Sequence, residues 1–206
     1  MECSYHARTP AEQRGAELYA RMCAVCHGAD GEGYKADNAP ALGHPDFLAS
    51  VSDAYLHDAV AGGRAGTTMS AWGTERGGPL PRADVDAVVA FLRTWATGDP
   101  ARLDERPPSG NSFRGALAFG RHCASCHGSR GVTGTAIHIG DAALLASASN
   151  GFLRYAIAHG RRGTPMAAFA DTLGEGGIED TVALLRSWQA QPAPAARAAP
   201  AMWSRA

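Results

Sequence analysis

Two short motifs with the same residue types lie one hundred positions apart in this chain. The sequence reads CAVCH over residues 23–27 and CASCH over residues 123–127. Each motif has two cysteines separated by two residues and a histidine directly after the second cysteine. A CxxC pair can form a thiol–disulfide redox centre or half of a zinc site. With the histidine appended, the pattern is the attachment signature of c-type haem, in which both thiols bond to the haem and the histidine binds iron.

The surroundings of the motifs favour haem attachment over the other two interpretations. A thiol redox motif is expected beside a βαβ pattern, and none is visible. A zinc site needs a second CxxC or an HxxxH nearby, whereas each motif has only its own pair. We therefore expect two covalently bound haems c, with His27 and His127 as the proximal iron ligands. The expected attachment residues are Cys23, Cys26, Cys123 and Cys126.

Both motifs belong to an internal repeat that runs through most of the chain. It predicts two domains, 10–98 and 111–190, joined by a Pro- and Gly-containing linker, 99–110, and followed by an Ala/Pro-rich tail, 191–206. Three pairs of segments align in order: RGAELYARMCAVCHG (14–28) with RGALAFGRHCASCHG (114–128), YLHDAVAGGRAGTTMSAW (55–72) with FLRYAIAHGRRGTPMAAF (152–169), and VVAFLRTW (88–95) with TVALLRSW (181–188).

Apolar residues at helical spacing predict three helices in each domain, with glycine-rich loops between them and no alternating strand pattern. Ser52 and either Ser149 or Asn150 are candidate N-caps of the middle helices. The predicted fold class is all-α, and such small loop-rich units gain stability from a large cofactor in the core. The predicted helices cover 11–22, 52–61 and 82–96 in the first domain, and 111–122, 149–159 and 177–189 in the second.

A second axial ligand is available in each domain at a matching position. Met69 lies in GTTMSAW and Met166 in GTPMAAF, each after a glycine-rich loop. A methionine sulfur on the second face closes the iron and raises its potential. We expect both methionines to be iron ligands. The alternatives are a packing role for the methionines, and a histidine ligand, His138 or His159, in the second domain.

The ordered set of features resembles the class I cytochrome c family. It comprises Gly–x–x–x–aromatic, CxxCH, a glycine-rich loop, a methionine and a last helix with an aromatic residue. The whole chain is similar to two-domain dihaem cytochromes c. The resemblance implies a proline carbonyl that accepts a hydrogen bond from the proximal histidine. Pro40 fits that role for His27, and Ile137 is the aligned residue for His127. It also implies that the glycine and the aromatic residue of the first helix pack against the last helix.

Two further pairs of residues match across the repeat near the methionines. Arg64 and Arg161 precede the methionine loops, where a guanidinium can hold a haem propionate through paired hydrogen bonds. The alternative for these arginines is an ordinary place on the surface. Trp72 and Phe169 follow each methionine by three residues, and we expect them beside the haem edge.

Composition narrows the function class and the kind of partner. The chain has 206 residues and a net charge of −1, so nothing indicates nucleic-acid binding. No apolar run approaches the ~20 residues that span a bilayer.

The charged side chains are unevenly distributed along the chain. Residues 1–98 carry eight basic and twelve acidic side chains, and residues 99–206 carry eleven basic and eight acidic side chains. Such a dipole can orient the molecule against a charged redox partner. Lys35 is the only lysine, unlike the lysine-ringed docking face of mitochondrial-type cytochromes c.

These features predict an electron-transfer protein at the periplasmic or extracytoplasmic face of a membrane. It would pass single electrons between respiratory or photosynthetic partners, as a free carrier or as a subunit of a membrane complex, with no catalytic side chain. Cys3 is a candidate lipid anchor or a free thiol. The alternative function is a dihaem oxidoreductase, peroxidase-like or sulfur-oxidising, with one open or His-ligated haem. A gas sensor in which Met166 dissociates is a third possibility.

Overall fold

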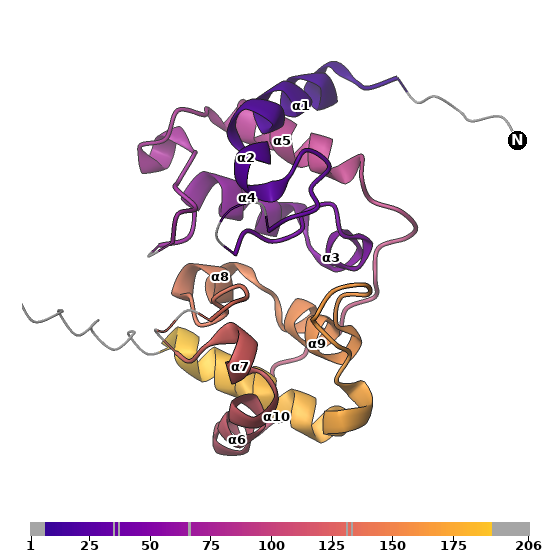
Figure 1. Ribbon diagram of the computed structural model, residues 1–206, viewed down its shortest axis with the longest axis vertical. Helices are drawn as coiled ribbons and strands as arrows, with labels where there is room; N and C mark the ends of the chain where they lie inside the picture. Colours follow the sequence, from indigo (N-terminus) through magenta and orange to yellow (C-terminus); the bar gives the residue numbers. More distant parts are fainter. Residues whose placement is uncertain are drawn as a thin grey trace, which may run out of the picture.

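The computed structural model describes residues 7–190 apart from residues 35, 37, 66, 131 and 133, so Cys3 and the tail lie outside the described residues. Within this part of the chain the structure is helical, with two isolated β-bridges, and the predicted all-α class is confirmed (Figure 1). The elements are α1 (Pro10–Met22), α2 (Ala24–His27), α3 (Pro45–Ser50), α4 (Asp53–Gly62), the 3-10 turn η1 (Thr74–Arg76), α5 (Arg82–Arg93), α6 (Ser112–His122), α7 (Ala124–His127), α8 (Ala142–Ser147), α9 (Asn150–His159) and α10 (Ala170–Ala190).

The first and last helices of each domain cross at a glycine. An added Cβ at Gly15 in α1 would lie 1.9 Å from the carbonyl oxygen of Ala87 in α5. At Gly115 in α6 it would lie 2.0 Å from the carbonyl oxygen of Asp180 in α10. A side chain of any size would push the helix pair apart, so this crossing requires glycine at both positions.

Aromatic rings next to these glycines fill the crossing. The ring of Tyr19 lies 5.5 Å from Phe91 and 5.1 Å from Trp95, between centroids. In the second domain Phe119 lies 4.9 Å from Trp188. Each ring set joins a separate hydrophobic cluster, one per domain, so the chain has two cores. The helix contact implied by the family resemblance is present in both domains. The exact bounds, 10–98 and 111–190, stay predictions.

The structure departs from the predicted helices at several points. Helices α2 and α7 were not predicted, and α5 ends at Arg93 rather than at 96. The short helices α3 and α8 lie within segments expected to be loops. The last helix begins at Ala170 rather than at 177, with an interruption at Gly174, where φ is +61°. The N-cap prediction is confirmed for Ser52 and Ser149, whose side chains accept backbone N–H hydrogen bonds from the first turns of α4 and α9.

In each domain, one arginine of the last helix holds a short helix in place. Arg93 donates to the carbonyls of Leu48 and Val51, both at 2.7 Å, at the end of α3. Arg186 makes the same pair of contacts at the end of α8, to residues that align with Leu48 and Val51. Because a short helix leaves its last carbonyls without intrahelical partners, each guanidinium acts as an external cap.

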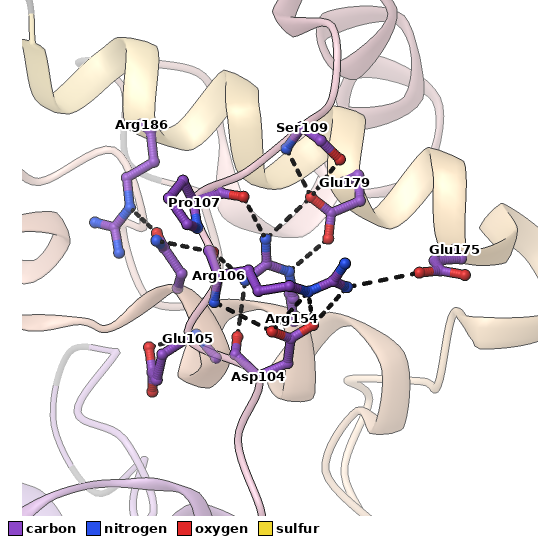
Figure 2. Close-up of polar contacts among 11 residues, drawn as sticks. Asp104, Glu105, Arg106, Pro107, Ser109, Arg154, Glu175, Glu179 and Arg186 are labelled. Carbon is purple, nitrogen blue, oxygen red and sulfur yellow. Dashed lines mark hydrogen bonds and ion pairs between the residues drawn. The ribbon is translucent and has the colours of Figure 1, made fainter.

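The predicted linker lies against the second domain instead of hanging free. Arg154 in α9 and Glu179 in α10 form an ion pair whose two side chains are each 10% exposed. Figure 2 shows the linker wrapping around this pair. Besides Glu179, the Arg154 guanidinium donates to three linker carbonyls: Asp104 (2.8 Å), Arg106 (2.7 Å) and Pro107 (3.3 Å).

The linker is also tied down at other points. Ser109 donates its N–H to Glu179 at 3.0 Å, and Glu105 accepts from the N–H of Gly151 at 3.0 Å. At its other end the N–H of Ala101 donates to the carbonyl of Ala49 in α3 at 2.8 Å. Both domains therefore hold the linker along its length.

The two domains meet at a seam with approximate two-fold symmetry. Helix α3 contacts α9, and α4 contacts α8 (Figure 1). In the repeat α3 corresponds to α8 and α4 to α9, so each contact repeats the other with the domains exchanged. This is the isologous arrangement that two copies of one chain make in a dimer.

Polar contacts close the seam around its apolar centre. Asp46 of α3, with a side chain 7% exposed, accepts from the N–H of Arg162 at 3.0 Å and pairs with its guanidinium at 2.7 Å. This pairing lowers the pKa of Asp46 to about 2, against the opposing effect of burial. His44 Nε2 lies 2.8 Å from the carbonyl of Arg162, and Asn38 donates to the carbonyl of Gly134 at 3.0 Å.

Candidate functional site

The histidine of each CxxCH motif is held by a main-chain carbonyl. His27 Nδ1 lies 2.9 Å from the carbonyl oxygen of Pro40, and His127 Nδ1 lies 2.8 Å from that of Ile137. With Nδ1 donating, Nε2 carries the lone pair that can bind a metal. Burial also lowers the pKa of His27, with the Pro40 contact opposing, and this keeps the imidazole neutral. A neutral, oriented imidazole is the form that binds iron.

The first cysteine of each motif has the wrong character for thiol redox chemistry. Cys23 and Cys123 have pKa values raised to about 11, by burial first and then by the neighbouring motif cysteine. Reactive thiols have lowered pKa values, so the thiol–disulfide interpretation is disfavoured. All four motif cysteines are free of disulfide bonds. Among the described residues, no three His, Cys, Asp or Glu side chains are arranged to hold a metal ion by themselves.

The two methionine loops have the same hydrogen bonds. The N–H of Arg64 donates to the carbonyl of Met69 at 2.8 Å, and that of Arg161 donates to the carbonyl of Met166 at 2.8 Å. Each methionine N–H in turn donates to a threonine hydroxyl two residues earlier, at 3.1 Å. The first loop reads TTM and the second TPM, yet these contacts are identical. Both half-buried methionines are therefore presented by the same closed turn.

A glycine before each arginine lets this turn close. Gly63 and Gly160 have φ values of +63° and +62°, a backbone region that residues with a Cβ rarely adopt. An added Cβ would also lie 2.6 Å from the carbonyl oxygen of Met69 and 2.4 Å from that of Met166. Glycine at these two positions therefore fixes the backbone position of Met69 and Met166.

The matched arginines lie at the seam. The Arg64 guanidinium carbon is 5.3 Å from the ring centroid of Tyr55, and that of Arg161 is 5.7 Å from Phe152. The Tyr55 and Phe152 rings are 5.3 Å apart across the seam. Burial lowers the pKa of Arg161. Within the described chain no ion pair joins either guanidinium to a carboxylate.

The other candidate residues fall into two groups. Trp72 packs against the first core and Phe169 against the second. The backbone N–H of Trp72 donates to a carbonyl in the last turn of α4, and that of Phe169 donates to a carbonyl in the last turn of α9. The rival histidines differ in position, and His159 directly precedes Gly160, where the second methionine loop begins. His138 directly follows Ile137, on the side of His127, and its buried Nε2 has no partner among the described groups. His159 is exposed at the end of α9, with its ring 4.4 Å from that of Tyr155.

Residue patterns alone gave no sign of two features around the site. The stacking of Tyr55 on Phe152 joins positions that the repeat alignment equates, but an alignment does not tell which equated positions touch. The Arg154 contacts depend on the path of the linker. A signal for Arg93 and Arg186 was present, since both sit in the aligned FLRTW and LLRSW segments.

The described part of the chain has no helix long and apolar enough to cross a membrane. The family model described as cytochrome c oxidase, cbb3-type, subunit III matches residues 10–92 and again 113–185. The FixP subunit of the cbb3-type cytochrome c oxidase of Azorhizobium caulinodans is 31% identical over 90 residues. These are 44% of this chain and 29% of FixP, so the chain matches under a third of that relative.

One solved structure agrees with the fold over most of this chain. A chain of the Kuenenia stuttgartiensis reducing HAO-like protein complex Kustc0457/Kustc0458 superposes with a TM-score of 0.53 at 19% identity, over 88% of this chain and 99% of that one. Cytochrome cL of Methylophaga aminisulfidivorans is 23% identical over 50% of this chain and 75% of its own, with a TM-score of 0.34. On the two matched segments, the chain is a tandem pair of class I cytochrome c domains and belongs to the family of cbb3-type cytochrome c oxidase subunit III.

Proposed function

We propose that this cytochrome c carries two haems, each ligated by histidine and methionine, and passes single electrons between redox proteins outside the cytoplasm. The observation that carries the proposal is the exact repetition of the site. In each domain a carbonyl-oriented histidine lies in the CxxCH motif and a methionine is fixed in a hydrogen-bonded turn. A function that needs one closed and one open haem would favour two different sites.

The residues of each site have separate tasks. Cys23 and Cys26, and likewise Cys123 and Cys126, would hold the haem by thioether bonds. His27 and Met69 would bind the iron in the first domain, and His127 and Met166 would bind it in the second. The haem supplies an iron that cycles between two oxidation states. The protein fixes the ligands, keeps water from the iron and neutralises charge at the haem carboxylates through Arg64 and Arg161.

The partner is proposed to be a membrane electron-transport complex, with this chain as a subunit or a close associate. Membership of the subunit III family and the match to FixP support this, although the matched region is under a third of FixP. The predicted domain bounds, the periplasmic location and a lipid at Cys3 also remain proposals, and Cys3 lies outside the described residues.

Carbon monoxide binding to the reduced protein tests the ligation. The haem content is first measured as the pyridine haemochrome, with two haems expected per chain. Wild type is then expected to bind no carbon monoxide promptly, because both irons carry two protein ligands. Prompt binding to one haem would replace the carrier by an oxidoreductase or a sensor.

Matched variants identify each ligand. Met69→Ala and Met166→Ala are each expected to create one carbon monoxide site per chain while the haem content stays at two. Met22→Ala is the control, since that methionine packs against the first core and lies directly before Cys23. A methionine variant that still binds none would show that another residue closes that haem.

A further inference from the structure

Four side chains form a continuous stack across the seam. The order is Arg64, Tyr55, Phe152, Arg161, with successive separations of 5.3, 5.3 and 5.7 Å. The two inner rings are tilted by 33° and come from α4 and α9. The two outer guanidiniums come from the loops that present the methionines. The stack therefore reaches from one methionine loop to the other through the centre of the seam.

The stack restricts both arginines in a way that hydrogen bonds alone do not. The Arg64 guanidinium donates a hydrogen bond to the carbonyl of Gly63 at 3.1 Å, and that of Arg161 donates to the carbonyl of Gly160 at 2.9 Å. A single bond to the preceding residue leaves a long side chain free to turn. A ring face under the guanidinium adds a cation–π contact of about 0.5–2 kcal/mol, larger where water is excluded.

We propose that Tyr55 and Phe152 are positioning residues for the haem carboxylates: stacked on each other, they hold Arg64 and Arg161 where each neutralises a carboxylate of its own domain's haem. The inference rests on the proposed function, since it needs a haem in each domain. A positive charge held near a haem carboxylate disfavours the ferric state, which carries the extra positive charge. The stack thus raises both haem potentials, and disturbing one ring affects both domains.

The same seam contains a ring that serves as a matched control. Phe47 packs edge-on against both inner rings, 6.2 Å from Tyr55 and 6.3 Å from Phe152. The cation–π contacts found in the described chain place no arginine over it. Phe47→Leu and Phe152→Leu both remove a seam ring and keep an apolar side chain. They differ in that only Phe152→Leu removes a ring on which a guanidinium stacks.

The experiment is a spectroelectrochemical titration of the full-length protein with both haems attached. Phe152→Leu is expected to lower both midpoint potentials, the second-domain haem most. The predicted change is about threefold in its reduction equilibrium, or about 28 mV at 59 mV per tenfold for one electron. Phe47→Leu is expected to leave both potentials in place. Tyr55→Phe and Phe152→Tyr keep the stack and should retain wild-type potentials.

A double-mutant comparison separates positioning from packing. Arg161→Leu should lower the second potential, and adding Phe152→Leu to it should add little, because the guanidinium that the ring positions is already gone. The proposal is overturned if Phe152→Leu moves neither potential, or if Phe47→Leu moves them as much. A haem content below two, or prompt carbon monoxide binding by wild type, would instead refute the proposed function.

Discussion

Replacing Arg154 by leucine is expected to release the linker and to destabilise the second domain. Arg154 and Glu179 are each only 10% exposed, and three linker carbonyls share the guanidinium. Leucine would leave the Glu179 carboxylate buried with its bond from the Ser109 N–H and without its ion-pair partner. Breaking a buried pair by removing one partner costs about 3–5 kcal/mol.

Thermal unfolding followed by far-ultraviolet circular dichroism measures this cost. For a domain of this size a loss of 1 kcal/mol lowers Tm by roughly 4–8 °C, so the second-domain transition should fall by about 12 °C or more. His57→Leu is the matched control. His57 and Asp86 occupy the aligned positions in the first domain, with a His57 Nε2 to Asp86 Oδ1 distance of 3.5 Å and an Asp86 side chain 55% exposed. A pair whose carboxylate is more than half exposed is worth about 1 kcal/mol or less.

Two further readouts make the prediction specific to the linker. Trypsin should cut the variant after Arg102, an exposed residue of the linker, because Arg154 no longer holds the carbonyls of Asp104 and Arg106 that follow it. Arg154, through its hydrogen bonds, lowers the pKa of Glu179 below its ordinary 4.5. The stabilisation is therefore complete above pH 4.5 and is lost as pH falls through the lower, folded value. A variant with unchanged cleavage and a loss under about 1 kcal/mol would refute the reasoning.

Four other substitutions have expected outcomes. Arg162→Leu should cost stability, because Asp46 would lose its hydrogen bonds from the Arg162 guanidinium. Because the pKa of Asp46 is about 2 in the fold, urea unfolding at several pH values should show this cost constant above pH 3.8 and vanishing as pH falls to about 2. Gly115→Ala should cost about 3 kcal/mol or more by chemical denaturation, since its Cβ would overlap the Asp180 carbonyl. Gly120→Ala in the same helix, with nothing within 4 Å, should be neutral or stabilising by up to about 1 kcal/mol. Met166→His should keep both haems attached and lower the potential of only the second, by potentiometry.

Features with a local cause were predictable from the sequence. The long helices follow from apolar spacing, and the Ser52 and Ser149 caps follow from a side chain that bonds its own first turn. The CxxCH motifs and the methionines are chemical signals at fixed positions. Repetition strengthened each of these, because two independent copies agreed.

Features with a non-local cause were not predictable. The six-residue helices α3 and α8 are too short to display a period, and distant arginines cap their last carbonyls. The pattern of the last helix began at 177 because Gly174 interrupts the helical backbone before it. Arg154 and Phe152 look like any polar and apolar residue of a middle helix. Their partners come from the linker and the opposite domain, so their roles can be identified only in the folded structure.

The two-fold seam determines how the pairing of the two domains responds when the protein is diluted. Two separate copies of one such domain, meeting through the same face, would dissociate whenever their concentration fell below the dissociation constant. Joining them by a short segment replaces that concentration with an effective local one, in the millimolar range for short linkers. Because both domains also bind the linker itself, the loop that must close is shorter still. The pairing of the two sites is thereby independent of how much protein is present, and one chain behaves as a permanent dimer.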